Sequence, residues 1–242
     1  MDRIAEHGGR CASLVAGFHA AKISNIPIGL RKTTSNLFRG REQTLRHKLD
    51  VRSFDNVLRV DLDRMIADVE GMTTYETLVD ETLRYGLLPA VVPQLKTITV
   101  GGAVSGLGIE SSSFKYGLVH ETVEEMEVLT GKGSIVACSP CMNQDLFFGF
   151  PNSYGTLGYA LRLTIRLVPA KPYVHLTHVR FSEPGGFFAH LAELSDRCDP
   201  DFLDGTIFGK DELYVNQAAF SDDAPWVSDY TYMDIYYRSI QQ

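Results

Sequence analysis

Glycine, serine and threonine are concentrated in one stretch of the chain, Pro93 to Gly117, which reads PQLKTITVGGAVSGLGIESSSFKYG. Glycine lets the backbone adopt left-handed angles and lets main-chain N–H groups approach a ligand closely. Converging N–H groups form a concavity that suits phosphate oxygens, and serine hydroxyls add further donors. The stretch therefore predicts a loop that wraps a phosphate-bearing cofactor. A glycine-rich surface turn is the alternative.

A second candidate phosphate-binding turn lies between Arg31 and Arg39. Its sequence, RKTTSNLFR, places cations around consecutive hydroxyl residues, directly after the apolar segment Ile28 to Leu30. Such a turn offers N–H groups, hydroxyls and positive charge to a pyrophosphate. A solvated polar turn would have the same composition. The candidate ligand contacts in this turn are Lys32, Thr33, Thr34, Ser35 and Asn36.

Several other signatures of nucleotide, acyl and metal chemistry are missing from the sequence. Gly106-Leu-Gly108 lacks the third glycine of the Rossmann fingerprint, and neither G-x-x-x-x-G-K-[ST] nor G-x-S-x-G occurs. His175 and His178 are three residues apart on a predicted strand, so they point to opposite faces and are a poor metal pair. We expect the histidines to be solvated or hydrogen bonded, and no metal to be bound.

The cysteines include one C-x-x-C pair, Cys138 and Cys141. A structural zinc site needs a second pair of ligands at similar spacing, and none follows. A redox dithiol remains an alternative, although this pair follows a predicted strand and does not open a clear helix. Reduced, partly buried cysteines in a cytosolic protein are the simpler expectation.

Composition and charge narrow the class of protein. The chain has 242 residues, of which 44% are hydrophobic and 22% charged, and a net charge of −7. These values are typical of globular domains and argue against a nucleic-acid-binding surface. No apolar run is long enough to predict a membrane span, and the N-terminal MDRIAEHGGR does not resemble a signal peptide. We therefore expect a cytoplasmic location.

Periodicity predicts the helices and strands that position these residues. Helical spacing indicates one helix near the N-terminus, weakened by Gly8-Gly9, and another that begins with the capping box Thr73-x-x-Glu76. Hairpins outnumber regular βαβ units, so the pattern predicts an α+β fold. The predicted elements are helices over 2–21, 73–86, 143–150 and 187–194, strands over 28–30, 87–92, 159–167 and 173–181, and hairpins over 57–70, 123–138 and 203–220.

From Val92 to Lys171 the chain resembles the PCMH-type FAD-binding domain, also called the vanillyl-alcohol-oxidase type. Within that family it is most similar to the delta(24)-sterol reductase branch, because Gly-Ile-Glu-Ser-Ser-Ser followed by Lys-Tyr-Gly is unusual elsewhere. The motifs that carry the resemblance are Pro93, Thr99-Val-Gly-Gly102, Gly106, Gly108-Ile-Glu-Ser-Ser-Ser113, Lys115-Tyr-Gly117, Asp145-Leu-Phe147, Gly155-Thr-Leu-Gly158 and Ile165 to Lys171.

The resemblance implies FAD as the cofactor and implies which segments hold it. Arg31 to Asn36 occupies the place of the family's first pyrophosphate loop, and Gly155 to Tyr159 that of a later glycine motif. The family's first loop often carries glycines and a histidine bonded to the flavin, and this loop has neither, so noncovalent FAD is expected. Besides the turn residues named above, the implied FAD contacts are Thr99, Val100, Gly101, Gly102, Ala103, Val104, Ser105, Gly106, Gly108, Ile109, Glu110, Ser111, Ser112, Gly155, Thr156, Leu157 and Gly158.

The resemblance also implies a domain organisation and a function. Residues 1–170 would form the FAD-binding domain with two α/β subdomains, and residues 171–242 the beginning of a substrate (cap) domain that is incomplete. The implied reaction is hydride transfer between flavin and a small or hydrophobic, lipid-like organic substrate, with an electron donor or acceptor that the sequence does not identify. The alternatives are a non-catalytic FAD-binding module and an enzyme that uses another nucleotide. Glu110 and Tyr154 are polar and near the cofactor segments, but no catalytic residue is assigned.

Overall fold

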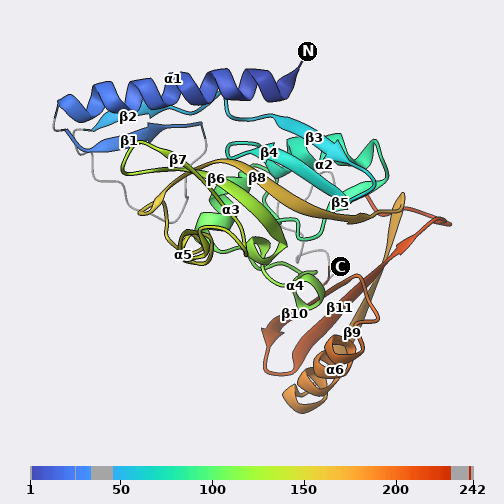
Figure 1. Cartoon of the computed structure of the whole chain (residues 1–242). Coiled ribbons are helices and arrows are strands. Elements are labelled where there is room, and N and C mark those ends of the chain that lie inside the picture. Colours follow the sequence, from blue (N-terminus) through green and yellow to red (C-terminus); the bar gives the residue numbers. More distant parts are fainter. Residues whose placement is uncertain (1, 25, 34–45, 230–239, 241–242) are drawn as a thin grey trace. The chain divides into compact units, whose positions relative to one another are not determined.

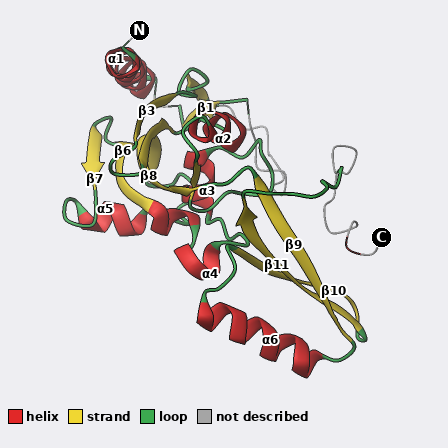
Figure 2. Cartoon of the chain, turned by 90° about the vertical axis from the view of Figure 1, so that its right-hand side faces the viewer, coloured by secondary structure: helices red, strands yellow, loops and turns green. Residues whose placement is uncertain are grey.

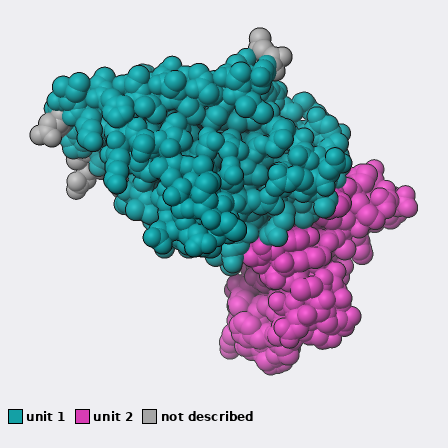
Figure 3. Space-filling model, in the orientation of Figure 1, with its two compact units in different colours: residues 1–110, 118–168 teal, residues 111–117, 169–242 magenta. Residues whose placement is uncertain are grey.

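The computed structural model describes residues 2–24, 26–33, 46–229 and 240 of the chain. Its contacts divide the chain into two compact units, coloured teal and magenta in Figure 3. The first unit comprises residues 1–110 and 118–168, and the second comprises residues 111–117 and 169–242. Both units mix helices and strands, so the chain has the α+β fold that the sequence predicts.

A six-stranded sheet forms the centre of the first unit (Figure 1). Its strands run in the order β3-β4-β8-β6-β7, and β5 also pairs with β8. The long strand β8 alternates apolar and polar residues, and its buried side chains Leu161, Leu163 and Ile165 form part of the core. The strand bounds are β3 Val57–Asp61, β4 Ile66–Glu70, β5 Leu87–Pro89, β6 Val123–Thr130, β7 Ile135–Cys138 and β8 Gly158–Pro169.

Helix α1 (Arg3–Ile23) begins at Asp2, whose carboxylate accepts hydrogen bonds from two amides of the first turn. The predicted weak point at Gly8-Gly9 is wrong, because the helix runs through both glycines without a break. Its buried face provides the stabilisation that the glycines lack, since tertiary packing outweighs local propensity. That face consists of His7, Cys11, Leu14, Phe18 and Ala21.

Beside α1, the parallel pair β1 (Ile28–Arg31) and β2 (His47–Asp50) forms a separate small sheet. Leu14 and Phe18 of α1 belong to the same core cluster as Leu49 of β2. Ile28 and Leu30 of β1 pack against that cluster. The connection between the two strands contains part of the predicted pyrophosphate turn.

The remaining helices of the first unit are short. Helix α2 (Tyr75–Leu83) is capped by Thr74, one residue after the predicted cap, because Thr73 is fully buried and its hydroxyl donates to the carbonyl oxygen of Asn56 at 3.0 Å. The glycine-rich stretch is not the loop that composition predicted, because it contains helix α3. The other bounds are α3 Val100–Gly106, a 3-10 turn at Val119–Thr122 and α5 Gln144–Gly149.

The second unit is a three-stranded antiparallel sheet with the order β10-β11-β9, and helix α6 packs against it (Figure 2). Phe187 and Leu194 of α6 form its core with Leu203, Leu213 and Val215 of the sheet. The short helix α4 (Ser113–Tyr116) belongs to this unit, because the Leu203 amide donates to the Ser111 carbonyl at 2.7 Å and Phe114 packs against the core. The bounds are β9 Tyr173–Phe181, α6 Pro184–Arg197, β10 Phe202–Gly209 and β11 Glu212–Ser221.

Candidate functional site

A groove of about 300 Å³ lies in the first unit, where three segments meet: the end of β1, the start of α3 and the loop that leads into β8. We call it the cofactor groove, after the ligand that the sequence predicts for these segments. Its volume is at the small end of the range for ligand pockets, roughly 300–1,000 Å³, so it suits part of a dinucleotide. The residues that line it are Phe18, Ile28, Gly29, Leu30, Lys32, Leu49, Gly71, Met72, Thr99, Gly101, Gly102, Ser105, Leu129, Thr130, Gly131, Phe150, Tyr154, Gly155, Thr156, Gly158, Tyr159 and Ala160.

The cofactor groove brings together predicted residues from all three sequence segments. Those that line it are Lys32, Thr99, Gly101, Gly102, Ser105, Gly155, Thr156 and Gly158. This clustering is a consequence of tertiary structure, because Lys32 and Gly155 are far apart in the sequence. Whether these residues contact a cofactor stays a prediction.

Other predicted contacts do not line the groove. Val100, Ala103 and Val104 are buried on the inner side of α3. Ser111 and Ser112 belong to the second unit. Thr34, Ser35 and Asn36 lie outside the described residues. The remaining predicted contacts without a place in the groove lining are Thr33, Gly106, Gly108, Ile109, Glu110 and Leu157.

The amides at the start of α3 are already hydrogen bonded within the protein. Val100 N–H donates to the carbonyl oxygen of Thr73 at 2.9 Å, and Gly101 N–H donates to that of Gly71 at 3.0 Å. Gly102 N–H donates to the hydroxyl of Thr99 at 3.2 Å, so Thr99 acts as the helix cap. These three N–H groups are therefore not the diphosphate donors that the sequence suggested, and α3 offers the groove a bare surface instead.

Two of the motif glycines are needed for close packing. A Cβ on Gly101 would lie 2.8 Å from the carbonyl oxygen of Gly71, and a Cβ on Gly108 would lie 2.6 Å from Cγ2 of Val119. Gly155, in contrast, has a φ of +81°, which L side chains rarely adopt. Glycine therefore has different roles within one motif set, namely close approach of segments at Gly101 and Gly108 and chain direction at Gly155.

The lining of the cofactor groove contains both apolar and polar residues. Phe18, Leu49, Met72 and Leu129 belong to the core cluster beneath it, and Tyr159 packs against the same cluster. Hydroxyl and amine groups from Lys32, Thr99, Ser105, Thr130 and Thr156 line the rest. Such a groove suits a ligand that joins a flat, weakly polar ring to a polar or anionic chain.

Sequence reasoning missed several groove residues, among them Phe18, Gly71, Gly131 and Tyr159. For Phe18 and Gly71 nothing in the local sequence points to a ligand, because they reach the groove only through the packing of α1 and β4. Tyr159 carried a usable signal, since it is a residue with a polar tip that directly follows the Gly155–Gly158 motif.

A buried ionic cluster surrounds Glu70, the residue directly before the groove residue Gly71, but Glu70 itself does not line the groove. Its centre is Glu70, whose side chain is fully buried and accepts hydrogen bonds from His7, Arg10 and Asn56 at 2.7 Å each. Glu127 lies 3.5 Å from the other ring nitrogen of His7, on the strand next to β8. Since its charges are paired, the cluster has the character of a structural network that anchors α1 to the sheet.

The pKa values in this cluster follow from its charges. Burial alone lowers the pKa of His7, but hydrogen bonds with Cys11, Glu127 and Glu70 outweigh it and raise the pKa to about 11. The hydrogen bond with His7 is the main cause that lowers the pKa of Glu127 to about 2. His7 is therefore a cation at neutral pH, held between two carboxylates.

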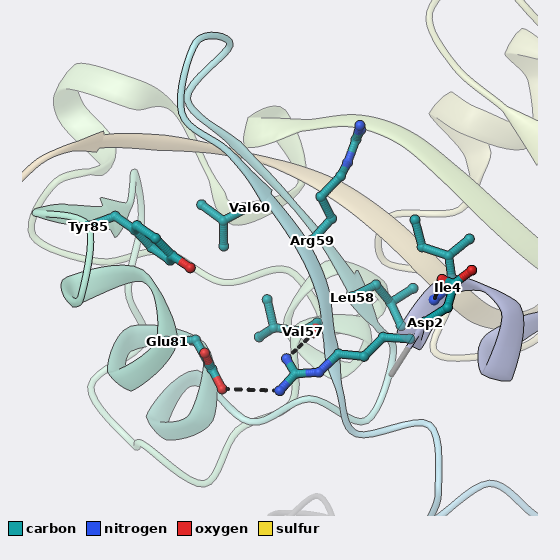
Figure 4. Close-up of a pocket in the computed structure, with 9 residues that line it drawn as sticks. Asp2, Ile4, Val57, Leu58, Arg59, Val60, Glu81 and Tyr85 are labelled. Carbon is teal, nitrogen blue, oxygen red and sulfur yellow. Dashed lines mark hydrogen bonds and ion pairs between the residues drawn. The ribbon is translucent and has the colours of Figure 1, made fainter.

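A further pocket, shown in Figure 4, lies between the start of α1, β3 and α2. Arg3 donates from its guanidinium to the carbonyl oxygen of Val57 at 2.7 Å and lies 3.7 Å from the carboxylate of Glu81. Tyr85 and Glu81 form the α2 side of the pocket in Figure 4. Arg3 is paired with Glu81, and Arg59 is paired with Asp61 and Asp68. Since these charges are already compensated within the protein, we do not consider this pocket a candidate cofactor site.

The cysteines and histidines of the described part give no sign of metal or dithiol chemistry. No group of three or more His, Cys, Asp or Glu side chains in residues 2–24, 26–33 and 46–229 could hold a metal ion. Cys138 is buried and Cys141 exposed, and both are free thiols. Burial, with a contribution from Glu125, raises the pKa of Cys138 to about 11, which opposes the thiolate that a redox dithiol needs.

Glu110 and Tyr154, to which the sequence assigns no catalytic role, lie in different surroundings. Tyr154 lines the cofactor groove. Glu110 does not line the groove. Burial raises the pKa of its carboxyl, and a hydrogen bond from the backbone of Gln94 partly offsets that rise.

Within the part of the chain that the structure describes, no helix is long and apolar enough to cross a membrane.

Comparison with known proteins agrees with these observations. A sequence profile of the FAD binding domain family matches residues 12–139. Human delta(24)-sterol reductase is 36% identical over 181 residues, which cover 74% of this chain and 34% of the human protein. The pea (Pisum sativum) delta(24)-sterol reductase is 41% identical over 132 residues, 54% of this chain and 23% of the relative. Rice (Oryza sativa subsp. japonica) cytokinin dehydrogenase 10 is 36% identical over 124 residues, which cover 51% of this chain and 22% of the rice protein.

The matched region includes α3, the β1–β2 pair and most of the groove. The chain therefore belongs to the FAD binding domain family, and it has the PCMH-type α+β fold that the sequence motifs predicted. It spans about a third of the length of the delta(24)-sterol reductases that it matches.

Proposed function

We propose that this member of the FAD binding domain family binds FAD noncovalently in the cofactor groove. The observation that carries the proposal is that the family match spans two of the three segments that form the groove, the end of β1 and the start of α3. A groove lined by both polar and apolar residues suits a dinucleotide, whose diphosphate is charged and whose bases are flat. Lys32 supplies positive charge to the diphosphate. The hydroxyls of Thr130 and Thr156 already donate to the carbonyl oxygens of Ser134 and Ser153, so toward a ligand they act as acceptors.

The groove residues fit such a ligand on structural grounds. Gly102 and Gly131 both line the groove, and a Cβ on Gly131 would meet no atom within 4 Å. The missing side chains leave room for a ligand to approach the backbone closely. Noncovalent binding is supported by the turn after β1, because the sequence has no histidine between residues 31 and 39.

For the whole protein we propose a FAD-dependent oxidoreductase. Bound flavin supplies hydride-transfer chemistry, whereas the protein supplies binding, orientation and shielding from water. The relatives named as a sterol reductase and a cytokinin dehydrogenase support an organic substrate, and the similarity to the sterol reductases favours a hydrophobic one. In this proposal residues 171–242 form the start of a substrate domain.

A second function, a FAD-binding module without catalysis of its own, is favoured by one observation. The chain spans about a third of the length of the sterol reductases that it matches. If catalysis needs groups from the rest of such a protein, this chain binds flavin but does not turn over substrate. Photoreduction of the flavin-loaded chain, followed by oxygen, quinone and dye acceptors, separates the two: reoxidation by any acceptor favours an enzyme, and no reoxidation favours the module.

Flavin binding tests the proposed function directly. Titration of purified chain with FAD is expected to quench flavin fluorescence and to leave a yellow protein after gel filtration. Gly131→Leu places a side chain into the groove and is expected to weaken FAD binding at least about tenfold, about 1.4 kcal/mol. The control Gly9→Leu also introduces a Cβ in open space, but on α1 and away from the groove. Wild-type protein that ignores FAD would refute the proposal.

A further inference from the structure

The buried ionic cluster contains a thiol, that of Cys11, in an arrangement that is known to activate cysteine. The Cys11 sulfur lies 3.3 Å from Nε2 of His7, and Nδ1 of the same ring lies 2.7 Å from the carboxylate of Glu70. Cys11 and His7 are four residues apart on α1, so they lie on one face of the helix. A thiol, an imidazole and a carboxylate that orients the imidazole form the usual set of groups around a nucleophilic cysteine.

A pocket of about 360 Å³ lies beside this thiol, between α1 and the six-stranded sheet. We call it the thiol pocket. Its α1 side consists of Ile4, His7, Gly8 and Cys11, and residues of β3, β4, β6, β7 and β8 form the other side. Cys11 keeps an exposed fraction of 7%, so a reagent that reaches it must be small.

Gly8 keeps the space beside the thiol open. It lines the thiol pocket about one helical turn before Cys11, and a Cβ placed on it would meet no atom within 4 Å. Glycine in a helix interior costs stability relative to alanine, and close packing does not require it here. A longer side chain at this position would occupy the pocket, so the glycine leaves Cys11 accessible to a small reagent.

The charge of His7 favours a negative charge on the sulfur. Burial alone lowers the pKa of His7, and among the contacts that raise it to about 11 the hydrogen bond with Cys11 is the largest. The imidazolium therefore presents an N–H donor to the sulfur. A cation beside a cysteine stabilises the thiolate, which is the form that reacts with electrophiles.

The two carboxylates beside the ring oppose a thiolate only weakly, because each is paired with a guanidinium. Glu70 lies 2.7 Å from Arg10, and Glu127 lies 2.8 Å from Arg162. Side chains of both charges line the thiol pocket, so it favours neither an anion nor a cation. The pocket therefore suits a small uncharged reagent.

We propose that Cys11 is a nucleophilic thiol, assisted by His7, which hydrogen peroxide oxidises to a sulfenic acid through the thiol pocket. The thiol releases its proton to solvent, and the sulfur then attacks one peroxide oxygen. An S–O bond forms and the O–O bond breaks, so sulfur is oxidised and the peroxide is reduced. The departing hydroxide takes the Nε2 proton of His7 and leaves as water, and His7 regains a proton from solvent.

The test treats the purified wild-type chain with hydrogen peroxide, traps sulfenic acid with dimedone and quantifies each cysteine peptide by mass spectrometry. Cys138 is buried and reports unfolding, whereas Cys198 is exposed and reports the activity of the reagent. We expect Cys11 to be trapped while Cys138 stays unmodified. No trapping of Cys11, or trapping only together with Cys138, would overturn the proposal.

His7→Gln tests the role of the imidazole. It is expected to slow the oxidation of Cys11 at least about tenfold, a modest value for the loss of a proton donor, and to leave Cys198 unchanged. A purely structural role of His7 predicts the opposite, because a loosened α1 would expose the thiol and speed its oxidation. A rate that is unchanged or faster, with Cys138 still unmodified, would show that His7 does not assist the thiol.

Gly8→Leu and Gly9→Leu form a matched pair that leaves every residue of the ionic cluster in place. A Cβ at either position would meet no atom within 4 Å, but Gly8 lines the thiol pocket and Gly9 does not. Gly8→Leu is expected to slow the oxidation of Cys11 several-fold, and Gly9→Leu to leave it unchanged. Equal rates in the two variants would overturn access through the pocket. No flavin is added in these experiments, so their outcome does not depend on the proposed function.

Discussion

The buried ionic cluster around Glu70 and the cofactor groove beside Gly71 share one core but differ in how their polar groups are satisfied. Glu70 is the last residue of β4, and Gly71, which lines the groove, follows it directly. The Glu70 carboxylate accepts hydrogen bonds from three side chains, whereas the buried Tyr159 hydroxyl has no partner in the described part of the chain. A network whose hydrogen bonds are complete stabilises the fold, whereas an unsatisfied buried hydroxyl lowers its stability.

The two regions also differ in the chemical groups that they use. The cluster is built from charged side chains on α1, β4 and β6. The groove is built largely from glycine backbone and from the tips of apolar side chains. Charged side chains bind one another tightly inside the protein, so they leave little for a ligand. Bare backbone leaves space, which is what a large cofactor needs.

The largest effect is expected from removing the centre of the ionic cluster. Glu70→Ala leaves the cations of His7 and Arg10 without their shared carboxylate, and such a loss costs about 3–5 kcal/mol of unfolding free energy. Urea unfolding monitored by circular dichroism measures it. Glu76→Ala, which breaks the exposed pair with Lys96, is the control and should cost less than about 1 kcal/mol. Equal losses in the two variants would contradict the distinction between cluster and surface.

A smaller effect on the free energy of unfolding is expected when a change of pH removes the charge of His7 or Glu127. The pKa of His7 is raised from 6.5 to about 11, so its contribution to stability is complete below pH 6.5 and is lost as the pH rises toward 11. The pKa of Glu127 is lowered from 4.5 to about 2, so its contribution is complete above pH 4.5 and is lost as the pH falls toward 2. The stability difference between wild type and His7→Gln should therefore be largest between pH 4.5 and 6.5.

Unfolding curves of both proteins at about pH 5.5 and about pH 9.5 test this expectation. The effect should be smaller than that of Glu70→Ala, because Glu70 keeps its bonds to Arg10 and Asn56 when His7 is neutral. A stability difference that stays constant between the two pH values would show that His7 is not a cation in the folded protein.

The smallest effects on stability are expected from alanine substitutions at two glycines, Gly101 in the groove and Gly9 in α1. Gly101→Ala places a Cβ 2.8 Å from the Gly71 carbonyl oxygen, a backbone atom that cannot move easily, and should cost about 1–3 kcal/mol. Gly9→Ala meets no atom within 4 Å inside a helix and should gain about 0.5–1 kcal/mol. Thermal unfolding of both variants measures the pair. The same sign for both would mean that close packing does not explain Gly101.

Much of the local structure could be predicted from the sequence because it depends on neighbouring residues. The hairpins of β3 with β4 and of β6 with β7, and the long strand β8, follow from alternation and from turn residues. Other local predictions failed where distant packing decides. Thr73 did not become the helix cap because it is buried against Asn56, and α1 continues through Gly8-Gly9 because its other face is packed.

The site was predictable in its segments but not in its geometry. The motifs pointed to Thr99–Gly102 and Gly155–Gly158, and members of both line the groove. The sequence did not reveal that the first amides of α3 are occupied by Thr73 and Gly71, because those bonds join segments far apart in the chain.

The sequence alone determined the class of this protein: an α+β chain with the ordered glycine motifs of the FAD binding domain family. Such motifs are local, since each turn or close approach requires glycine at a fixed position. Only the tertiary structure decided what each position does, because burial and hydrogen bonding depend on which distant segments meet. Gly101 contacts the backbone of Gly71, and Tyr159 ends beside that same backbone with its hydroxyl unpaired among the described residues.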